Sequence, residues 1–229
     1  MYAKYFKRVL DFILSLVALI VLSPILLILL LIGAVAMRGN PIFVQPRPGK
    51  IGKDGREKIF RLLKLRTMSN ARDKDGNLLP DAVRLNAYGR FLRSTSADEL
   101  PSLLNILKGD LAIVGPRPLA VQYLPFYNET ERKRHTVRPG LTGLAQVNGR
   151  NALNWPERFR YDVEYVNNIS FKMDLLIVCK TVQNVLGRKD IAVRGTTEIV
   201  DFDVYRKAEL EQNTITERVL SSNEQLAKK

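Results

Sequence analysis

The sequence predicts an α+β fold that is mostly helical and is held at a membrane by its N-terminal segment. Three observations support this prediction. Residues 12–37 contain no charged side chain, two short apolar runs with a Gly- and Lys-rich connection predict a β-hairpin, and the later apolar residues recur mainly at helical spacing. We therefore expect a membrane helix over residues 1–37, a globular domain over 38–195 and a polar tail over 196–229.

The uncharged N-terminal run could form a helix of about 39 Å, which is longer than the roughly 30 Å apolar core of a bilayer. Three interpretations are open: a spanning anchor, a secretory signal, and a re-entrant helix that enters and leaves by the same face. Basic residues flank the run on both sides, Lys7 and Arg8 before it and Arg38 and Arg47 after it. Such residues mark the cytoplasmic side of a membrane, so both ends prefer the same side.

The dipeptide Ser23-Pro24 lies in the middle of this run. Proline removes a helical hydrogen bond and bends the axis, and a neighbouring serine hydroxyl can satisfy the freed carbonyl. A central break between two basic flanks favours the re-entrant helix, although spanning helices also tolerate proline.

The composition is strongly basic, with a formal net charge of +13. Such a charge indicates polyanionic partners: nucleic acid, anionic lipid headgroups or phosphorylated substrates. The sequence lacks a helix-turn-helix or zinc pattern, and aromatic residues do not alternate with its basic runs, which disfavours nucleic acid. We expect Cys179 to be a small core or interface hydrophobe and His135 to be a solvated surface residue, so a disulfide, a histidine metal site and a Ser-His-Asp triad are poorly supported.

The predicted hairpin joins strands at 41–45 and 59–65. Alternation places Lys64 and Arg66 on one face, either as a phosphate-binding pair or as ordinary solvated charge. A short helix over 84–93 then brings Arg93 close to the adjacent carboxylates of the next segment.

Those carboxylates, Asp98 and Glu99, stand at the start of a predicted helix with Leu100, Leu103, Leu104 and Leu107 on its buried face. They could hold a divalent cation or attack phosphorus. They could equally cap the helix, either as a capping box from Ser96 to Glu99 or through Asp98 alone. Arg117, between two prolines, could bind phosphate oxygens through its planar fork.

The second half of the chain alternates short elements with turns. We expect a buried strand at 111–114, a polar helix at 124–134, a turn-rich loop at 137–143, and helices at 155–168 and 171–186. The last of these is amphipathic and carries Asp174. Its apolar stripe is explained either by core packing or by a position in the lipid headgroup layer.

Five sequence blocks follow one another in order: Ser23-Pro24, 64–68 (KLRTM), Arg93 with 98–101 (DELP), 114–118 (VGPRP) and 138–147 (RPGLTGLAQV). Together they resemble the blocks of the bacterial sugar transferases known as small monotopic phosphoglycosyl transferases, over roughly residues 1–190. Within that family, 81–125 and 148–151 are most similar to the PglC-like transferases that use a bacillosamine-type sugar.

The resemblance implies transfer of a sugar-1-phosphate from a UDP-sugar, such as UDP-diacetylbacillosamine, to polyprenol phosphate, with release of UMP. It implies that Asp98 is the nucleophile and a Mg²⁺ ligand, that Glu99 is its partner, and that other side chains line the substrate site. Those side chains are Lys64, Arg93, Arg117 and Asp174.

The resemblance also places residues 38–195, as a catalytic domain, on the cytoplasmic face of the bacterial inner membrane, with anionic lipid headgroups and no nucleic acid as partners. UDP-glucose or UDP-galactose is the alternative donor, and a membrane-tethered basic binding module is the rival function. The polyprenol, the role of the tail and the oligomeric state, including a homodimer, stay open.

Overall fold

A computed structural model describes residues 1–149, 153–187, 200–212 and 214. It confirms a mostly helical α+β fold with a long apolar N-terminal helix and a small antiparallel sheet. The α-helices are α1 Lys7–Ala36, α2 Asp81–Arg84, α3 Ala87–Thr95, α4 Ser102–Lys108, α5 Glu129–Arg132, α6 Leu144–Val147, α7 Trp155–Asn167 and α8 Phe171–Leu186. The strands are β1 Ile42–Ile51, β2 Glu57–Leu65, β3 Ala112–Val114 and β4 Gly140–Thr142.

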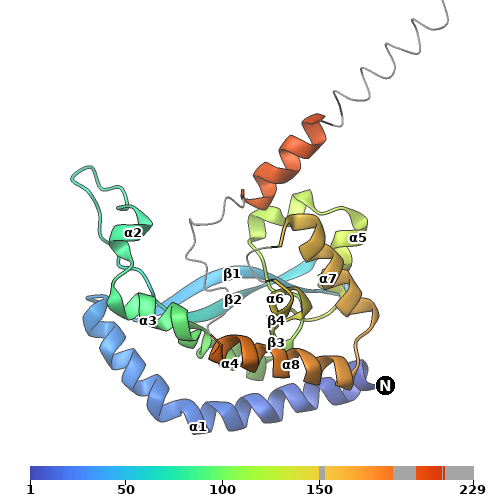
Figure 1. Cartoon of the computed structure of the whole chain (residues 1–229), viewed down its shortest axis with the longest axis horizontal. Helices are drawn as coiled ribbons and strands as arrows, with labels where there is room; N and C mark the ends of the chain where they lie inside the picture. The colour runs from blue at the N-terminus through green and yellow to red at the C-terminus, as the bar shows by residue number, and fades with distance from the viewer. Residues whose placement is uncertain (150–152, 188–199, 213, 215–229) are drawn as a thin grey trace, which may run out of the picture.

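Helix α1 is a long bent helix that runs along one side of the molecule (Figure 1). Among the described helices, the one at Tyr2–Ala36 is long and apolar enough to cross a membrane, with a mean hydropathy of 3.1 and only 11% of that window buried. The Ser23 hydroxyl donates to the Ile20 carbonyl at 2.8 Å, the group that Pro24 leaves without its helical donor. The helix is continuous through Pro24, so the predicted break is a bend.

Both ends of α1 are fixed to the rest of the chain. Near its start, the Arg8 guanidinium donates to the carbonyls of Ile106 and Leu107 at 2.6 and 2.7 Å, at the end of α4. Near its end, the Tyr88 hydroxyl donates to the Leu29 carbonyl at 2.7 Å, and Asn86 donates to Ala36. The helix is therefore attached to the globular domain near both of its ends.

The predicted β-hairpin is confirmed, and one of its faces covers α4. Phe60 and Leu62 of β2 pack against Leu103 and Ile106 in one buried cluster. Asn105 bonds the hairpin backbone on both sides, donating to the Arg61 carbonyl and accepting from the Leu63 amide. The predicted buried face of α4 is wrong in part, because Leu104 is 43% exposed and Asn105 occupies the buried side.

A second, parallel strand pair joins two blocks that are distant in the sequence. The strand predicted at 111–114 is confirmed as β3, but residues 137–143, expected to be a loop, contain its partner β4. The two chains approach so closely that a Cβ on Gly140 would lie 2.1 Å from the Gly115 nitrogen. Glycine is required there, and the pairing brings the loop of Arg117 against residues 140–142.

Two other helices differ from the prediction. The helix expected at 84–93 is two helices, α2 and α3, because the chain is extended at Leu85 and Asn86 then caps α3 by accepting from the Gly89 amide. The helix expected at 124–134 is a series of short turns: 3-10 helix Val121–Phe126, α5, and 3-10 helix Lys133–Thr136. The helices at 155–168 and 171–186 are confirmed as α7 and α8.

Part of the segment after residue 195, expected to be a polar tail, packs against the domain. Residues 202–212 form a helix, and Phe202 is fully buried among Leu119, Tyr123, Trp155 and Phe159. This aromatic cluster makes the segment part of the domain. The other tail positions, 196–199, 213 and 215–229, lie outside the described residues.

His135 lies in the opposite environment to the one expected, because it is buried, with its Nδ1 3.3 Å from Glu57 Oε1. Cys179 is exposed on α8, so a core position is wrong and an interface position stays a prediction. Phe171, Leu175 and Val182 are also more than half exposed. Core packing therefore does not account for this part of the apolar stripe of α8.

Candidate active site

The two adjacent carboxylates stand on a single 3-10 turn, Ala97–Glu99, between α3 and α4. Ser96 ends α3 in the left-handed conformation, with φ of 57°, and turns the chain toward α4. Neither capping interpretation is right, because no side chain caps this turn or α4. Asp98 and Glu99 instead face basic side chains from other parts of the chain.

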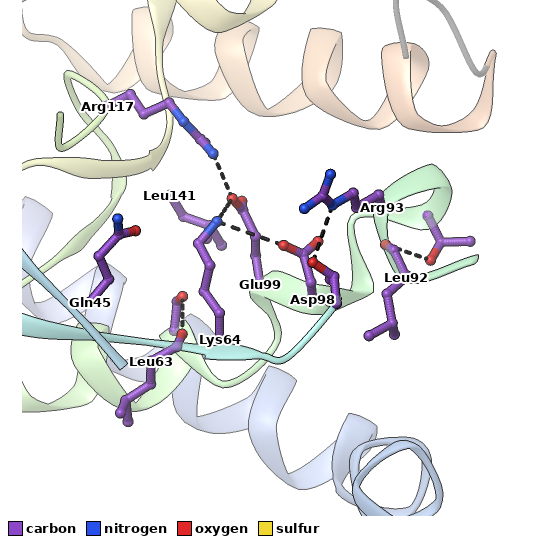
Figure 2. Close-up of polar contacts among 12 residues, drawn as sticks. Gln45, Leu63, Lys64, Leu92, Arg93, Asp98, Glu99, Arg117 and Leu141 are labelled. Atoms are coloured by element: carbon purple, nitrogen blue, oxygen red, sulfur yellow. Dashed lines mark hydrogen bonds and ion pairs between the residues drawn. The ribbon is translucent and has the colours of Figure 1, made fainter. Parts of the chain in front are cut away.

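Glu99 is held by two cations. Lys64 Nζ, from the end of β2, lies 2.6 Å from Glu99 Oε1, and Arg117 Nη2 lies 2.8 Å from the same oxygen (Figure 2). Lys64 Nζ is 3.7 Å from Asp98 Oδ2, beyond hydrogen-bonding distance. The hairpin and the loop of Arg117 thus meet at Glu99, whereas Asp98 keeps a looser contact.

This asymmetry separates the acidities of the two carboxyl groups. Burial acts to raise the pKa of Glu99, but Arg117 and Lys64 outweigh it and lower the pKa to about 2. Burial raises the pKa of Asp98, the negative charge of Glu99 adds to the rise, and Lys64 opposes it. Paired carboxyl groups with divergent pKa values are typical of sites in which the two have different tasks.

Arg93 lies next to Asp98 on the side away from Glu99 (Figure 2). Its Nε donates to the Thr67 hydroxyl at 3.2 Å, and Nη2 lies 3.0 Å from the Met68 sulfur. The backbone brings these residues together because Gly89 lets α3 approach Thr67; a Cβ there would be 1.9 Å from the Thr67 carbonyl oxygen. The predicted delivery of Arg93 to the acidic pair is therefore seen in the structure.

A small cleft opens beside Glu99. Its polar members come from four separate segments of the chain, and apolar residues complete its lining. The lining residues are Arg47, Leu62, Lys64, Glu99, Ser102, Leu111, Arg117, Pro118, Gly140 and Leu141. A phosphorylated ligand bound there would meet Lys64 and Arg117 together.

Asp174 is not brought to this cluster among the described residues. Its Oδ2 accepts from the Tyr2 hydroxyl and from Lys7 Nζ, and its Oδ1 accepts from the Tyr165 hydroxyl, at 2.6 to 2.7 Å. These bonds join the start of α1 to α7 and α8. In this geometry Asp174 stabilises the contact between these helices. Its substrate-binding role stays a prediction.

Sequence reasoning missed a buried ion pair that supports the loop of Arg117. Arg134 is 1% exposed; it binds Asp162, with Nε 3.0 Å from Oδ2, and its Nη2 donates to the Arg117 carbonyl at 2.6 Å. The run of charges at 131–138 resembles a solvated surface segment, so the sequence offers no local signal for this burial. Asp162 follows Trp155 and Phe159 at helical spacing, and this position on the apolar face could have indicated its burial.

The acidic pair suits a magnesium ion. Mg²⁺ is commonly held by one or two carboxylates together with substrate phosphates and water. In the part of the chain that the structure describes, no group of three or more His, Cys, Asp or Glu side chains is gathered. Asp98 would therefore have to bind the ion together with phosphate oxygens, and its loose contact with Lys64 leaves it suited to do so.

Comparison with known proteins identifies the family. Residues 2–188 match the family described as bacterial sugar transferase, which is most of the chain. The chain belongs to the bacterial sugar transferase family. A similar member of this family, an uncharacterized sugar transferase EpsL from Bacillus subtilis, is 53% identical over 167 residues, which are 72% of this chain and 80% of that protein.

Other bacterial sugar transferases among the relatives carry more specific names. One is a UDP-glucose:undecaprenyl-phosphate glucose-1-phosphate transferase of Klebsiella pneumoniae, 40% identical over 77% of this chain. Another is an undecaprenyl-phosphate galactose phosphotransferase of Salmonella typhimurium, 36% identical over 81% of this chain. The matched regions are only 39% and 41% of those two proteins, which are longer than this chain.

Proposed function

We propose that this chain transfers a sugar-1-phosphate from a UDP-sugar to a membrane polyprenol phosphate, releasing UMP. One observation carries the proposal: two neighbouring carboxylates share a basic site, but only Glu99 is closely ion-paired. That arrangement leaves Asp98 as the nucleophile. The names of the Klebsiella and Salmonella relatives, both undecaprenyl-phosphate sugar transferases, support the same reaction class.

In the proposed first step, an Asp98 oxygen attacks the sugar-bearing phosphorus of the UDP-sugar. The bond from this phosphorus to the bridging oxygen breaks, and UMP leaves with the electron pair. Lys64, Arg93 and Arg117 reduce the repulsion between the carboxylate and the diphosphate and stabilise charge on the leaving group. A Mg²⁺ ion bound at Asp98 would add further positive charge at the phosphates.

In the proposed second step, an oxygen of polyprenol phosphate attacks the same phosphorus. The bond to Asp98 breaks, which restores the carboxylate and leaves a polyprenyl diphosphate sugar. Glu99 holds Lys64 and Arg117 in place during both steps, since both cations bind its Oε1. A covalent intermediate of this kind predicts ping-pong kinetics.

For the sugar, we propose a UDP-linked N-acetylated amino sugar, such as UDP-diacetylbacillosamine, on the similarity of residues 81–125 to PglC-like transferases. UDP-glucose and UDP-galactose are the alternatives, and the names of two relatives support them. A panel of UDP-sugars decides between these donors.

We further propose that α1 is re-entrant in the inner membrane, with the domain on the cytoplasmic face. Basic residues flank both ends of its apolar run, and both ends of the helix bind the same domain. The exposed apolar side chains of α8 would then lie in the headgroup layer, where the basic excess of the chain favours anionic lipids. The lipid acceptor would reach Asp98 without leaving the bilayer.

The test is release of UMP from a panel of UDP-sugars in the presence of Mg²⁺ and polyprenol phosphate. We expect Asp98→Asn to lower the rate by at least about a thousandfold, because the carboxamide is a poor nucleophile. Asp81→Asn, at an exposed carboxylate on α2, is the matched control and should retain activity. Normal turnover by a folded Asp98→Asn protein would refute the covalent mechanism.

A further inference from the structure

The cleft beside Glu99 is lined by one more basic side chain, which the proposed mechanism does not use. Arg47, from β1, lines this cleft together with Lys64, Glu99 and Arg117. Its Nη2 lies 2.7 Å from Gln45 Oε1, two residues earlier on the same strand. The guanidinium is therefore oriented by a neighbour within the hairpin.

The strand register places these side chains on one face. Gln45 is opposite Leu62, Arg47 is opposite Phe60, and Lys64 is opposite Phe43, so alternation directs Gln45, Arg47 and Lys64 to the same side. Figure 2 shows Gln45 and Lys64 rising from the same side of the strands, below Arg117. Lys64 is four residues beyond Phe60 on β2, so the backbones of Lys64 and Arg47 lie about 13 Å apart along the hairpin. Long side chains at that separation can contact opposite ends of one diphosphate group.

The chemistry of the substrate also favours an arginine at this position. A UDP-sugar carries a negative charge on each of its two phosphates, and the leaving UMP gains charge as the bond breaks. The planar fork of Arg47 is suited to bidentate contact with phosphate oxygens.

We propose that Arg47, oriented by Gln45, binds the phosphate of the UMP part of the sugar nucleotide. The inference rests on the proposed function, because it names a residue for the nucleotide half of that substrate. It divides the site into two parts: Asp98 and Arg93 act at the sugar-bearing phosphorus, and Arg47 acts at the phosphate that leaves.

The experiment measures binding of UMP to the full-length protein in detergent, by calorimetry and without a lipid acceptor. Arg47→Ala should weaken UMP binding by about tenfold to a hundredfold, the usual effect of losing a charge-assisted hydrogen bond. Arg47→Lys should recover part of the affinity, because it keeps the charge but loses the fork. Gln45→Leu should weaken binding less than Arg47→Ala, since it only releases the orientation of the guanidinium.

Arg61→Ala is the matched control, because Arg61 is an exposed arginine on the opposite face of the same hairpin. It should bind UMP as the unaltered protein does. In turnover assays, Arg47→Ala should raise the KM for the UDP-sugar and leave the KM for polyprenol phosphate within about twofold.

Unchanged UMP affinity in a folded Arg47→Lys protein and in Arg47→Ala would overturn the proposal. A raised KM for polyprenol phosphate alone would overturn it as well, by placing Arg47 at the lipid phosphate. If the unaltered protein binds UMP but transfers no sugar from any donor, the proposed function fails, while the UMP measurement still decides the role of Arg47.

Discussion

At the scale of single residues, the two carboxylates of the site differ in how closely cations bind them. Asp98 and Glu99 are neighbours with the same charge and similar exposure, yet Glu99 takes both close cations and Asp98 takes none within 3.5 Å among the described residues. The sequence alone could nominate the pair, because adjacent carboxylates before a proline are easily recognised. It could not assign their tasks, since the difference arises from Lys64 and Arg117, which are distant in the chain.

This inequality leads to a pH prediction. In the proposed mechanism Asp98 attacks as a carboxylate, and its pKa is raised, so kcat/KM should fall as pH drops through a value above the ordinary aspartate range. Lys64 acts to lower that pKa; Lys64→Met should therefore move the acidic limb of the residual activity to higher pH. The measurement is kcat/KM against pH for both proteins, with Arg61→Met as the control. A limb that moves to lower pH would contradict this electrostatic account.

His135 gives a second pH prediction, for stability. Burial lowers its pKa from 6.5 to about 4, so the unfolded chain takes up a proton first as the pH falls. The contribution of neutral His135 to the free energy of unfolding should be fully present above pH 6.5. It should decline by at most about 3 kcal/mol between pH 6.5 and about 4. Glu57, whose pKa is lowered to about 2, affects the free energy of unfolding only at more acidic pH.

Denaturant unfolding at several pH values tests the role of His135. His135→Gln should flatten the stability curve between pH 6.5 and 4. The same slope in both proteins would show that other groups control the acid response.

At the scale of elements, the predictions agree with the structure where the apolar residues recur with a clear local periodicity. The hairpin and helices α7 and α8 follow from alternation, turn residues and helical spacing. Strand β4 could not be predicted, because its pairing depends on Gly140 meeting Gly115, a contact that no local pattern reveals. The turn at Ala97–Glu99 was mistaken for a helix cap, since the left-handed conformation of Ser96 is not readable from the sequence.

The segment after residue 200 supplies a stability prediction at this scale. Phe202→Ala should lower the free energy of unfolding by about 3–5 kcal/mol, because a fully buried phenyl ring leaves a cavity in the aromatic cluster. Val204→Ala, at a side chain 51% exposed in the same helix, should change it by less than about 0.5 kcal/mol. Equal effects in the two variants would mean that this helix does not dock on the domain.

At the scale of the whole molecule, the proposed membrane position rests on the bent α1. Hydrogen bonds near its start and near its end attach it to one domain, with exposed apolar side chains between them. A straight spanning helix would carry one of those ends to the opposite face of the membrane. Ser23-Pro24 predicted the bend of α1, and the re-entrant position that the basic flanks favour stays a prediction.

Single cysteines at position 3 and position 50, both exposed, test that prediction. The exposed Cys179 must first be replaced, because it would itself react. In sealed inverted membrane vesicles, a membrane-impermeant maleimide should label both positions to the same extent. Labelling of one position only would show that α1 crosses the membrane.

The bonds between Lys7 and Asp174 have a consequence for biosynthesis. These residues are 167 positions apart, so at 5–20 residues per second a ribosome needs roughly ten to thirty seconds to synthesise the partner of Lys7. During that interval the apolar helix has already emerged, while α8, which fixes its first turn, does not yet exist. Closure of this contact is therefore among the last events of folding, and the nascent helix must be protected from aggregation until then.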